Sequence, residues 1–273
     1  MFAVSYGDDT SLTGHVAANT VVIGGVTVAA QAVAMPTSFS TGIIEDPSDG
    51  IVGLGFQKMN SICSKGSPAP DAANDACPDG YGPNPRATWF ENAKGALRGG
   101  VFAANLKFGT KGGYSFGVVD EKAFRGKLNW VGVDSSKGFW QVGSSGYRVG
   151  GKGGGNGEGL KRYKAQDGIV DSGSSLLMLE PEVVAEYYRG VKGAKKDRTG
   201  WTYPCGTKLP DFGLAVGEGK EEYVAEVPGK VIDYAPTSDP KSEYLFLSLL
   251  AERFGLGFIA NELYSLLWRH PGN

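Results

Sequence analysis

Asp171 is the residue whose type and surroundings best fit chemistry in this chain. It follows the small and β-branched apolar residues 168–170, which are typical of a buried strand, and precedes the Ser/Gly run 172–175. A carboxylate between apolar runs is costly to bury unless hydroxyl and backbone N–H groups surround it, and this run supplies both. Gly173 allows a tight turn and the close approach of a ligand. The pattern is also compatible with a plain turn that leaves Asp171 exposed.

Other chemistries find little support in the residue inventory. His15 and His270 are the only histidines, they lie far apart in the sequence, and no nucleophile-elbow pattern accompanies them. The three cysteines lack the paired spacing of a zinc site, so no metal or other cofactor is expected. Residues 146–153 nearly match a phosphate-binding loop, but Gly153 replaces the required hydroxyl residue and more glycines follow instead of a helix. Carboxylate chemistry remains.

The composition indicates a β-rich protein that can position such a carboxylate. The 273 residues include 43 glycines, and short Val-, Thr-, Tyr- and Phe-rich runs alternate with turn signals. This length allows one large domain or two lobes. The net charge is −2 without a basic cluster, so we expect no nucleic-acid partner. No run of about 18 apolar residues occurs, so we expect no membrane span.

Local patterns predict the elements around the Asp171 segment. Residues 1–35 alternate as strands, with turn signals at 7–11 and at Gly24-Gly25. Gly150–Gly159 is expected to form a surface loop. Further strands are expected at 101–106, 113–120, 130–133 and 138–142, and helices at 89–97, 181–188 and 259–268.

Four segments, in order, resemble the pepsin-like aspartic proteases, and most closely the fungal secreted group. Gly168–Leu177 is similar to the second active-site segment of the family, Asp-Thr/Ser-Gly-Thr/Ser-Ser. Tyr6-Gly7-Asp8 resembles the flap hairpin that closes over bound peptide, and the segments 49–54 and 203–212 match in turn. The resemblance implies an all-β, bilobal fold with few short helices. We expect an incomplete N-terminal lobe over residues 1–122 and a C-terminal lobe over residues 123–273.

The resemblance also assigns roles to individual residues. Asp171 is implied as a catalytic residue of an aspartic endopeptidase, in which two aspartates share a proton and activate water against an amide. The partners implied are peptide or protein substrates, and the chain is expected to be a monomer. Residues expected to contact substrate are Tyr6, Gly7, Asp8, Val52, Gly173, Ser174 and Ser175.

Two departures from the family pattern put activity in doubt. Only Asp171 is followed by Ser/Thr-Gly, so the partner aspartate has no counterpart in this sequence. After Pro236 the sequence diverges, and the hydrophobic-hydrophobic-Gly segment that should pack against the Asp171 loop is not recognised. We therefore expect impaired proteolysis. The alternatives are a non-catalytic peptide-binding protein, an inactive fragment that does not fold, or two chains that each contribute an Asp171.

The cysteines and the first residues of the chain give information on where the protein is located. Cys63 and Cys77 flank a polar loop, and either close it as a local disulfide or remain free thiols, while Cys205 is left unpaired. The first residues provide neither the basic region nor the apolar stretch of a secretory signal. Extracellular localisation is thus expected from the resemblance alone.

Overall fold

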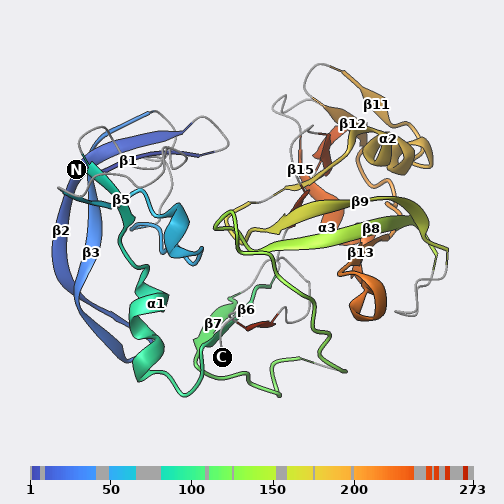
Figure 1. Cartoon of the computed structure of the whole chain (residues 1–273). Coiled ribbons are helices and arrows are strands. Elements are labelled where there is room, and N and C mark those ends of the chain that lie inside the picture. Colours follow the sequence, from blue (N-terminus) through green and yellow to red (C-terminus); the bar gives the residue numbers. More distant parts are fainter. Residues whose placement is uncertain are drawn as a thin grey trace. The chain divides into compact units, whose positions relative to one another are not determined.

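The computed structural model divides into two compact units, which we describe separately (Figure 1). The first unit comprises Met1–Gly100 and Ser135–Phe139, and the second comprises Val101–Asp134 and Trp140–Asn273. Strands dominate both, with few short helices, as the all-β prediction requires. The predicted lobe boundary at residue 122 stays a prediction. The structure describes residues 2–6, 10–40, 49–65, 81–107, 111–124, 126–151, 159–174, 176–197, 200–236, 244–247, 249–251, 256–258 and 267–269.

The elements of the first unit are β1 (Phe2–Ser5), β2 (Ser11–Ile23), β3 (Val26–Phe39), η2 (Gln57–Met59), β4 (Cys63–Lys65), β5 (Tyr81–Pro85), α1 (Trp89–Ala93) and η3 (Lys94–Ala96). Those of the second unit up to α2 are β6 (Val101–Asn105), β7 (Gly113–Phe116), β8 (Gln141–Val149), β9 (Lys161–Val170), β10 (Leu177–Leu179) and α2 (Pro181–Arg189). The remaining ones are β11 (Lys195–Lys196), β12 (Trp201–Pro204), β13 (Phe212–Val216), η4 (Gly219–Glu221), β14 (Tyr223–Val227), α3 (Gly229–Ile232), β15 (Asp233–Pro236), β16 (Tyr244–Leu247), β17 (Leu249–Ala251), β18 (Leu256–Phe258) and β19 (Leu267–Arg269).

A three-stranded antiparallel sheet, in the order β1-β2-β3, forms the framework of the first unit. The predicted turn lies between β2 and β3, where Gly24 and Gly25 have φ of 58° and 80°. Two successive positive φ values are what a tight hairpin of this kind needs, and glycine adopts them at little cost. Phe2, Leu12 and Ile62 form a buried hydrophobic cluster of this unit.

The short helix α1 begins with a capping box. The Thr88 hydroxyl accepts a hydrogen bond from the Glu91 N–H, and a Glu91 carboxylate oxygen accepts one from the Thr88 N–H at 3.0 Å. These bonds satisfy backbone donors that the helix itself leaves unpaired. Trp89, Phe90 and Ala93 are buried, so the helix covers apolar surface of the first unit.

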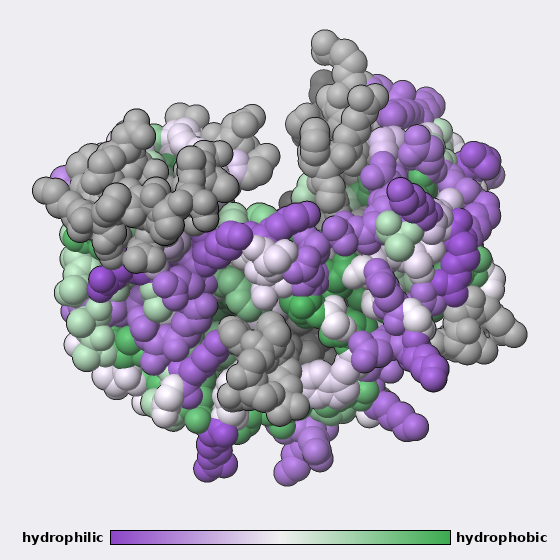
Figure 2. All heavy atoms as spheres, in the orientation of Figure 1, coloured by the Kyte–Doolittle hydropathy of each residue, from purple (hydrophilic) through white to green (hydrophobic). Residues whose placement is uncertain are grey.

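The second unit is built on a seven-stranded sheet in the order β14-β13-β8-β9-β18-β10-β17. Helix α2 begins with Pro181 and buries Val183, Val184, Tyr187 and Tyr188. The ring of Tyr187 packs edge-on against Phe212 of β13 at 6.0 Å, and its hydroxyl donates to the Pro210 carbonyl at 2.7 Å. The predicted helix over residues 181–188 is thus confirmed. Hydrophilic residues predominate on the face around α2 and β11 in Figure 2.

Strands from the C-terminal part of the chain, β16 and β19, belong to the two smaller sheets of this unit. These sheets have the orders β11-β12-β16-β15 and β19-β6-β7. The predicted helix over residues 259–268 is wrong at its end, because Leu267 and Trp268 belong to β19 and pair with Ala103 and Phe102. Hydrogen bonds to the edge of β6 override the helical spacing of the apolar residues. Residues 259–266 lie outside the described part of the chain.

Two other strand predictions differ from the structure. Residues 130–133 are not a strand, and the strand expected at 138–142 begins only at Gln141, because Gly138 has φ of 85° in a turn. The segment 49–56 is irregular, and Ile51 and Val52 are exposed. Residues 146–149 lie within β8, which agrees with the rejection of a phosphate-binding loop there. In the described part of the chain, none of the helices is both long and apolar enough to cross a membrane.

Candidate active site

Asp171 lies where β9 leaves the seven-stranded sheet. The last residues of β9 are held from one side by β8, where Gln141 is opposite Ile169 and the Val170 N–H donates to the Trp140 carbonyl at 2.9 Å. Gly168 is buried. The apolar strand end therefore fixes the backbone directly before the carboxylate, as the sequence predicts.

The residues after Asp171 form a turn around its carboxylate. One oxygen, Oδ1, accepts a hydrogen bond from the Gly173 N–H at 2.8 Å, and Oδ2 accepts one from the Ser174 hydroxyl at 2.6 Å. An aspartate that bonds the N–H two residues on is a common way to stabilise a turn. Asp171 itself is exposed. Each of its two oxygens is thus oriented and still open to solvent.

Gly173 lies close to the Asp171 carboxylate in this turn. A Cβ atom built on Gly173 would lie 3.1 Å from Asp171 Oδ1, which is tighter than most real contacts. Any larger residue would push the carboxylate by a few tenths of an ångström. Sequence reasoning had assigned Gly173 to substrate contact, and the structure adds this role in orienting Asp171.

Strand β18 is the positioning element that the sequence did not reveal. Leu256, Gly257 and Phe258 run parallel to β9, opposite residues 168–170, and Gly257 also pairs with Met178 of β10. The chain therefore crosses from β9 to β10 past the end of β18, and the Asp171 turn makes that crossing. No hydrophobic-hydrophobic-Gly segment is recognised in the sequence for this place, and the structure puts β18 there. Gly255-Leu256-Gly257-Phe258 was a usable signal, because glycine permits close approach of strands.

The other predicted substrate residues are only partly described. Ser175 lies outside the described residues, as do Gly7 and Asp8 of the predicted flap. Tyr6 directly follows β1 and is 40% exposed. Its N–H donates to the Thr10 carbonyl at 2.8 Å, which closes the base of the hairpin tip. Val52 is 55% exposed. The structure thus brings together Asp171, Gly173 and Ser174 of the predicted set.

Glu186 and Glu222 of the second unit are engaged in ion pairs with Lys161 and Arg162. Arg162 hydrogen-bonds the Glu222 carboxylate at 2.6 Å and thereby lowers the pKa of Glu222. Hydrogen bonds from Lys161, and then from Tyr147, lower the pKa of Glu186. Neither carboxylate is hydrogen-bonded to Asp171. Among the residues that the structure describes, no three His, Cys, Asp or Glu side chains gather in a way that could hold a metal ion.

The arrangement around Asp171 suits proton transfer. An exposed, oriented carboxylate can accept a proton from a bound water or, when protonated, donate one to a carbonyl oxygen. A single carboxylate cannot do both in one step. Two carboxylates placed close together divide the roles, because they cannot both ionise and so share one proton.

Comparison with known proteins identifies relatives. A family model described as eukaryotic aspartyl protease matches residues 1–246. Penicillopepsin-1 of Talaromyces stipitatus is 37% identical over 237 residues, which cover 86% of this chain and 53% of that protein. Aspergillopepsin-1 of Aspergillus fumigatus is 38% identical over 88% of this chain and 54% of its own length. The chain thus spans about half the length of the curated relatives it matches.

A solved structure supports the fold independently. The aspartic proteinase from Irpex lacteus superposes with a TM-score of 0.67, covering 97% of this chain and 73% of the other. Its sequence is only 18% identical, so the likeness concerns the fold. It agrees with the all-β, bilobal architecture predicted from the sequence.

Proposed function

Because the chain belongs to the eukaryotic aspartyl protease family, we propose that it serves aspartic-type endopeptidase chemistry, with Asp171 as one of two catalytic carboxylates. The observation that carries this proposal is the exposed Asp171 carboxylate, oriented by Gly173 and Ser174 at the end of β9. The substrate class is an extended peptide or protein. No cofactor or metal is part of the proposal.

The second carboxylate is the element on which activity depends. In the proposed reaction the ionised member of the pair removes a proton from water, and the protonated member donates to the amide carbonyl as it becomes tetrahedral. Asp171 is the only aspartate of these 273 residues that is followed by Ser/Thr-Gly. We therefore propose that the chain by itself is impaired in catalysis and that an Asp-Thr/Ser-Gly segment from outside it completes the site.

Complementation tests this proposal. The chain is assayed on a quenched-fluorescence peptide with apolar side chains at the scissile bond, alone and fused at its N-terminus to the part of a fungal relative that carries the first Asp-Thr-Gly of the family. We expect cleavage only from the fusion, blocked by a statine-type transition-state mimic. In the fusion, Asp171→Asn should lower kcat/KM by about a thousandfold, and Asp167→Asn on the same strand should not.

The assay distinguishes failure of the proposed impairment from failure of the assignment of Asp171. Cleavage by the chain alone that disappears with Asp171→Asn would contradict the impairment but keep the assignment of Asp171. Dimerisation of the active chain in sedimentation would then point to two Asp171 residues in one site, against the monomer that we propose. Cleavage that is indifferent to Asp171→Asn would contradict the assignment itself.

A peptide-binding role without turnover is the second candidate. It is favoured by the exposure of Tyr6 and Val52, which leaves both apolar side chains accessible to a peptide. Calorimetry with a statine-containing peptide should then give binding to the chain alone, without hydrolysis. A chain that does not fold is the remaining alternative, and a cooperative thermal transition would contradict it.

The proposal extends to the remaining roles and to the compartment. Tyr6, Gly7, Asp8, Val52, Gly173, Ser174 and Ser175 are proposed to contact substrate. We also propose that Cys63 pairs with Cys77 and that the protein acts outside the cell, without a nucleic-acid partner. The pairing is supported by Cys63 being disulfide-bonded while Cys205 is free and exposed. Cys77 lies outside the described residues.

A further inference from the structure

Trp140 makes a main-chain hydrogen bond just beyond the end of a strand pair. Strand β8 begins at Gln141, which lies opposite Ile169 at this end of the ladder between β8 and β9. The bond from the Val170 N–H to the Trp140 carbonyl, at 2.9 Å, lies one residue further on. Val170 directly precedes Asp171. In the described part of the chain, this bond is therefore the main-chain contact on the β8 side that lies nearest to the Asp171 turn.

The side chain of Trp140 supports this hydrogen bond. The ends of strand pairs tend to fray, so a bond in this place needs support of its own. Trp140 is only 8% exposed, and its ring packs edge-on against that of Phe102, with centroids 5.4 Å apart and planes at 80°. Such a contact stabilises an aromatic pair beyond the area that it buries. Phe102 is buried too, and its ring lies 6.2 Å from that of Phe116.

The aromatic anchor belongs to a different sheet from Asp171. Phe102 of β6 lies opposite Phe116 of β7 in the sheet β19-β6-β7, whereas Val170 ends a strand of the seven-stranded sheet. All of these residues belong to the second unit. Trp140 therefore joins two sheets of this unit at one point. Its ring contacts β6, and its carbonyl holds the end of β9.

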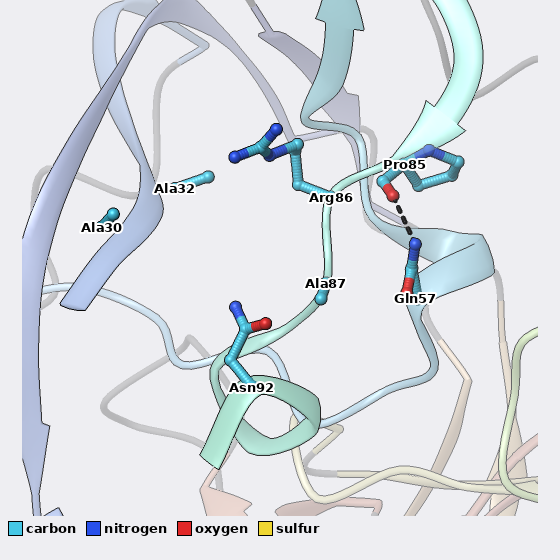
Figure 3. Close-up of a pocket in the computed structure, with 7 residues that line it drawn as sticks. All are labelled: Ala30, Ala32, Gln57, Pro85, Arg86, Ala87 and Asn92. Carbon is cyan, nitrogen blue, oxygen red and sulfur yellow. Dashed lines mark hydrogen bonds between the residues drawn. The ribbon is translucent and has the colours of Figure 1, made fainter. Parts of the chain in front are cut away.

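Close packing allows the ring to act as an anchor. A cavity of about 280 Å³ lies in the first unit, between Ala30 and Ala32 of β3 and the stretch from Pro85 to Asn92 (Figure 3). A side chain that borders such a space can shift without moving its neighbours. Trp140 is instead enclosed by its neighbours, and a closely packed interior transmits displacements. A shift of its ring would therefore reach its own carbonyl and the N–H that this carbonyl holds.

We propose that Trp140 is a positioning residue for Asp171. It fixes the last residue of β9 from one side, while Phe258 of β18 lies opposite the same residue on the other side. Loss of the Trp140 ring releases the backbone directly before the carboxylate. A displacement of about 1 Å at a reacting group can cost up to about a hundredfold in rate. The catalytic consequence rests on the proposed function, whereas the positioning itself does not.

Amide hydrogen exchange on the full chain tests the positioning. Trp140→Leu should accelerate exchange of the Val170 N–H about tenfold more than exchange in the pair β13–β14, which is the range of one aromatic pair. Trp140→Phe keeps an aromatic ring and should retain most of the protection. The matched control is Leu214→Ala, a buried change in β13, which should accelerate exchange in β13–β14 at least as much as at Val170. Equal acceleration in both places by Trp140→Leu overturns the proposal.

A variant of the anchor tests whether the support comes through Phe102. Phe102→Leu leaves Trp140 in place and should accelerate exchange at Val170 selectively, while thermal melting confirms the fold. The double variant should add little to either single change, because both remove the same contact. Fully additive effects, or no effect of Phe102→Leu at Val170, overturn the link between the two sheets.

Kinetics of the fusion protein described above test the catalytic consequence. Trp140→Leu should lower kcat about tenfold and change KM by less than about twofold, because the carboxylate is misplaced while the substrate contacts remain. Trp140→Phe should restore most of kcat, and Leu214→Ala, assayed well below its Tm, should leave kcat unchanged. A rise in KM with unchanged kcat overturns the positioning role in catalysis. If the unmodified fusion cleaves no peptide, the proposed function fails, and exchange at Val170 still decides whether Trp140 positions the Asp171 turn.

Discussion

The strands around Asp171 and the outer strand of the first unit differ in how many partners hold them. β9 lies between β8 and β18, so the backbone that leads to Asp171 is fixed from both sides. In the described part of the first unit, β3 pairs with β2 alone, and the neighbouring segment 49–55 contains the exposed side chains of Ile51 and Val52. Pairing on both sides fixes the backbone of β9, whereas β3 is held on its other side by side-chain hydrogen bonds, such as those that join Gln31 to Ala87 and Asn92.

The largest expected effect on the free energy of unfolding comes from a substitution in the core beneath the seven-stranded sheet. Phe212 is fully buried in β13 between Tyr147 and Tyr187, so Phe212→Ala should lower the free energy of unfolding by about 3–5 kcal/mol. Val52→Ala, at an exposed position, should change it by less than about 0.5 kcal/mol. Denaturant titration measures both. Similar values for the two would contradict the contrast between a packed and an exposed region.

Next in size is a change in β18. Gly257→Pro removes an N–H from a strand that has partners on both sides and should lower the free energy of unfolding by about 1–3 kcal/mol. Hydrogen exchange should then accelerate at residues 168–170 of β9, next to Asp171, but not in the pair β13–β14, which serves as the internal control. Unchanged protection at 168–170 would mean that β18 does not support the Asp171 turn.

A smaller effect is expected at the start of α1 in the first unit. Thr88→Ala removes the hydroxyl that accepts the Glu91 N–H and should cost about 1 kcal/mol. Thr88→Ser keeps the acceptor and should recover most of the loss, measured as the shift in Tm. If serine does not restore stability, packing of the Thr88 methyl group accounts for the effect instead.

The smallest effect concerns alkaline pH. Burial, and then the hydrogen bond to Glu186, raises the pKa of Tyr147 to about 12. An unfolded tyrosine ionises near pH 10, so this residue stabilises the fold below pH 10, and the contribution is lost as pH rises toward 12. Tyr147→Phe should lower Tm at pH 7. Between pH 9 and 11, the Tm of this variant should decrease less than that of the unmodified protein. Tyr114→Phe, at an exposed position, is the control, and equal slopes in both variants would contradict this role.

Local sequence patterns predicted much of the framework. Alternating residues with Gly24-Gly25 specified the β2–β3 hairpin, and Pro181 followed by an amphipathic run specified α2. The Asp-Ser-Gly-Ser run specified a turn at the end of a strand, with its hydroxyl and N–H groups turned to Asp171. These features depend on residues within a few positions of one another, so short windows of sequence contain the information.

Longer-range features were less predictable. The spacing of apolar residues near the C-terminus favoured a helix, yet Leu267 and Trp268 are in a strand because the edge of β6 offers hydrogen-bond partners. Residues 130–133 have strand-forming composition but no ladder among the described residues, so composition alone was misleading. In each case the deciding factor was the presence or absence of a neighbouring strand.

The sequence by itself determined the turn around the Asp171 carboxylate, because Asp171, Gly173 and Ser174 interact across only three positions. Tertiary structure alone decided that β18, more than 80 residues further along the chain, lies between β9 and β10 in the sheet. The physical reason is that any strand can satisfy the backbone groups of another. Pairing of distant strands is therefore fixed by the hydrogen bonds and packing of the whole sheet, not by a local pattern.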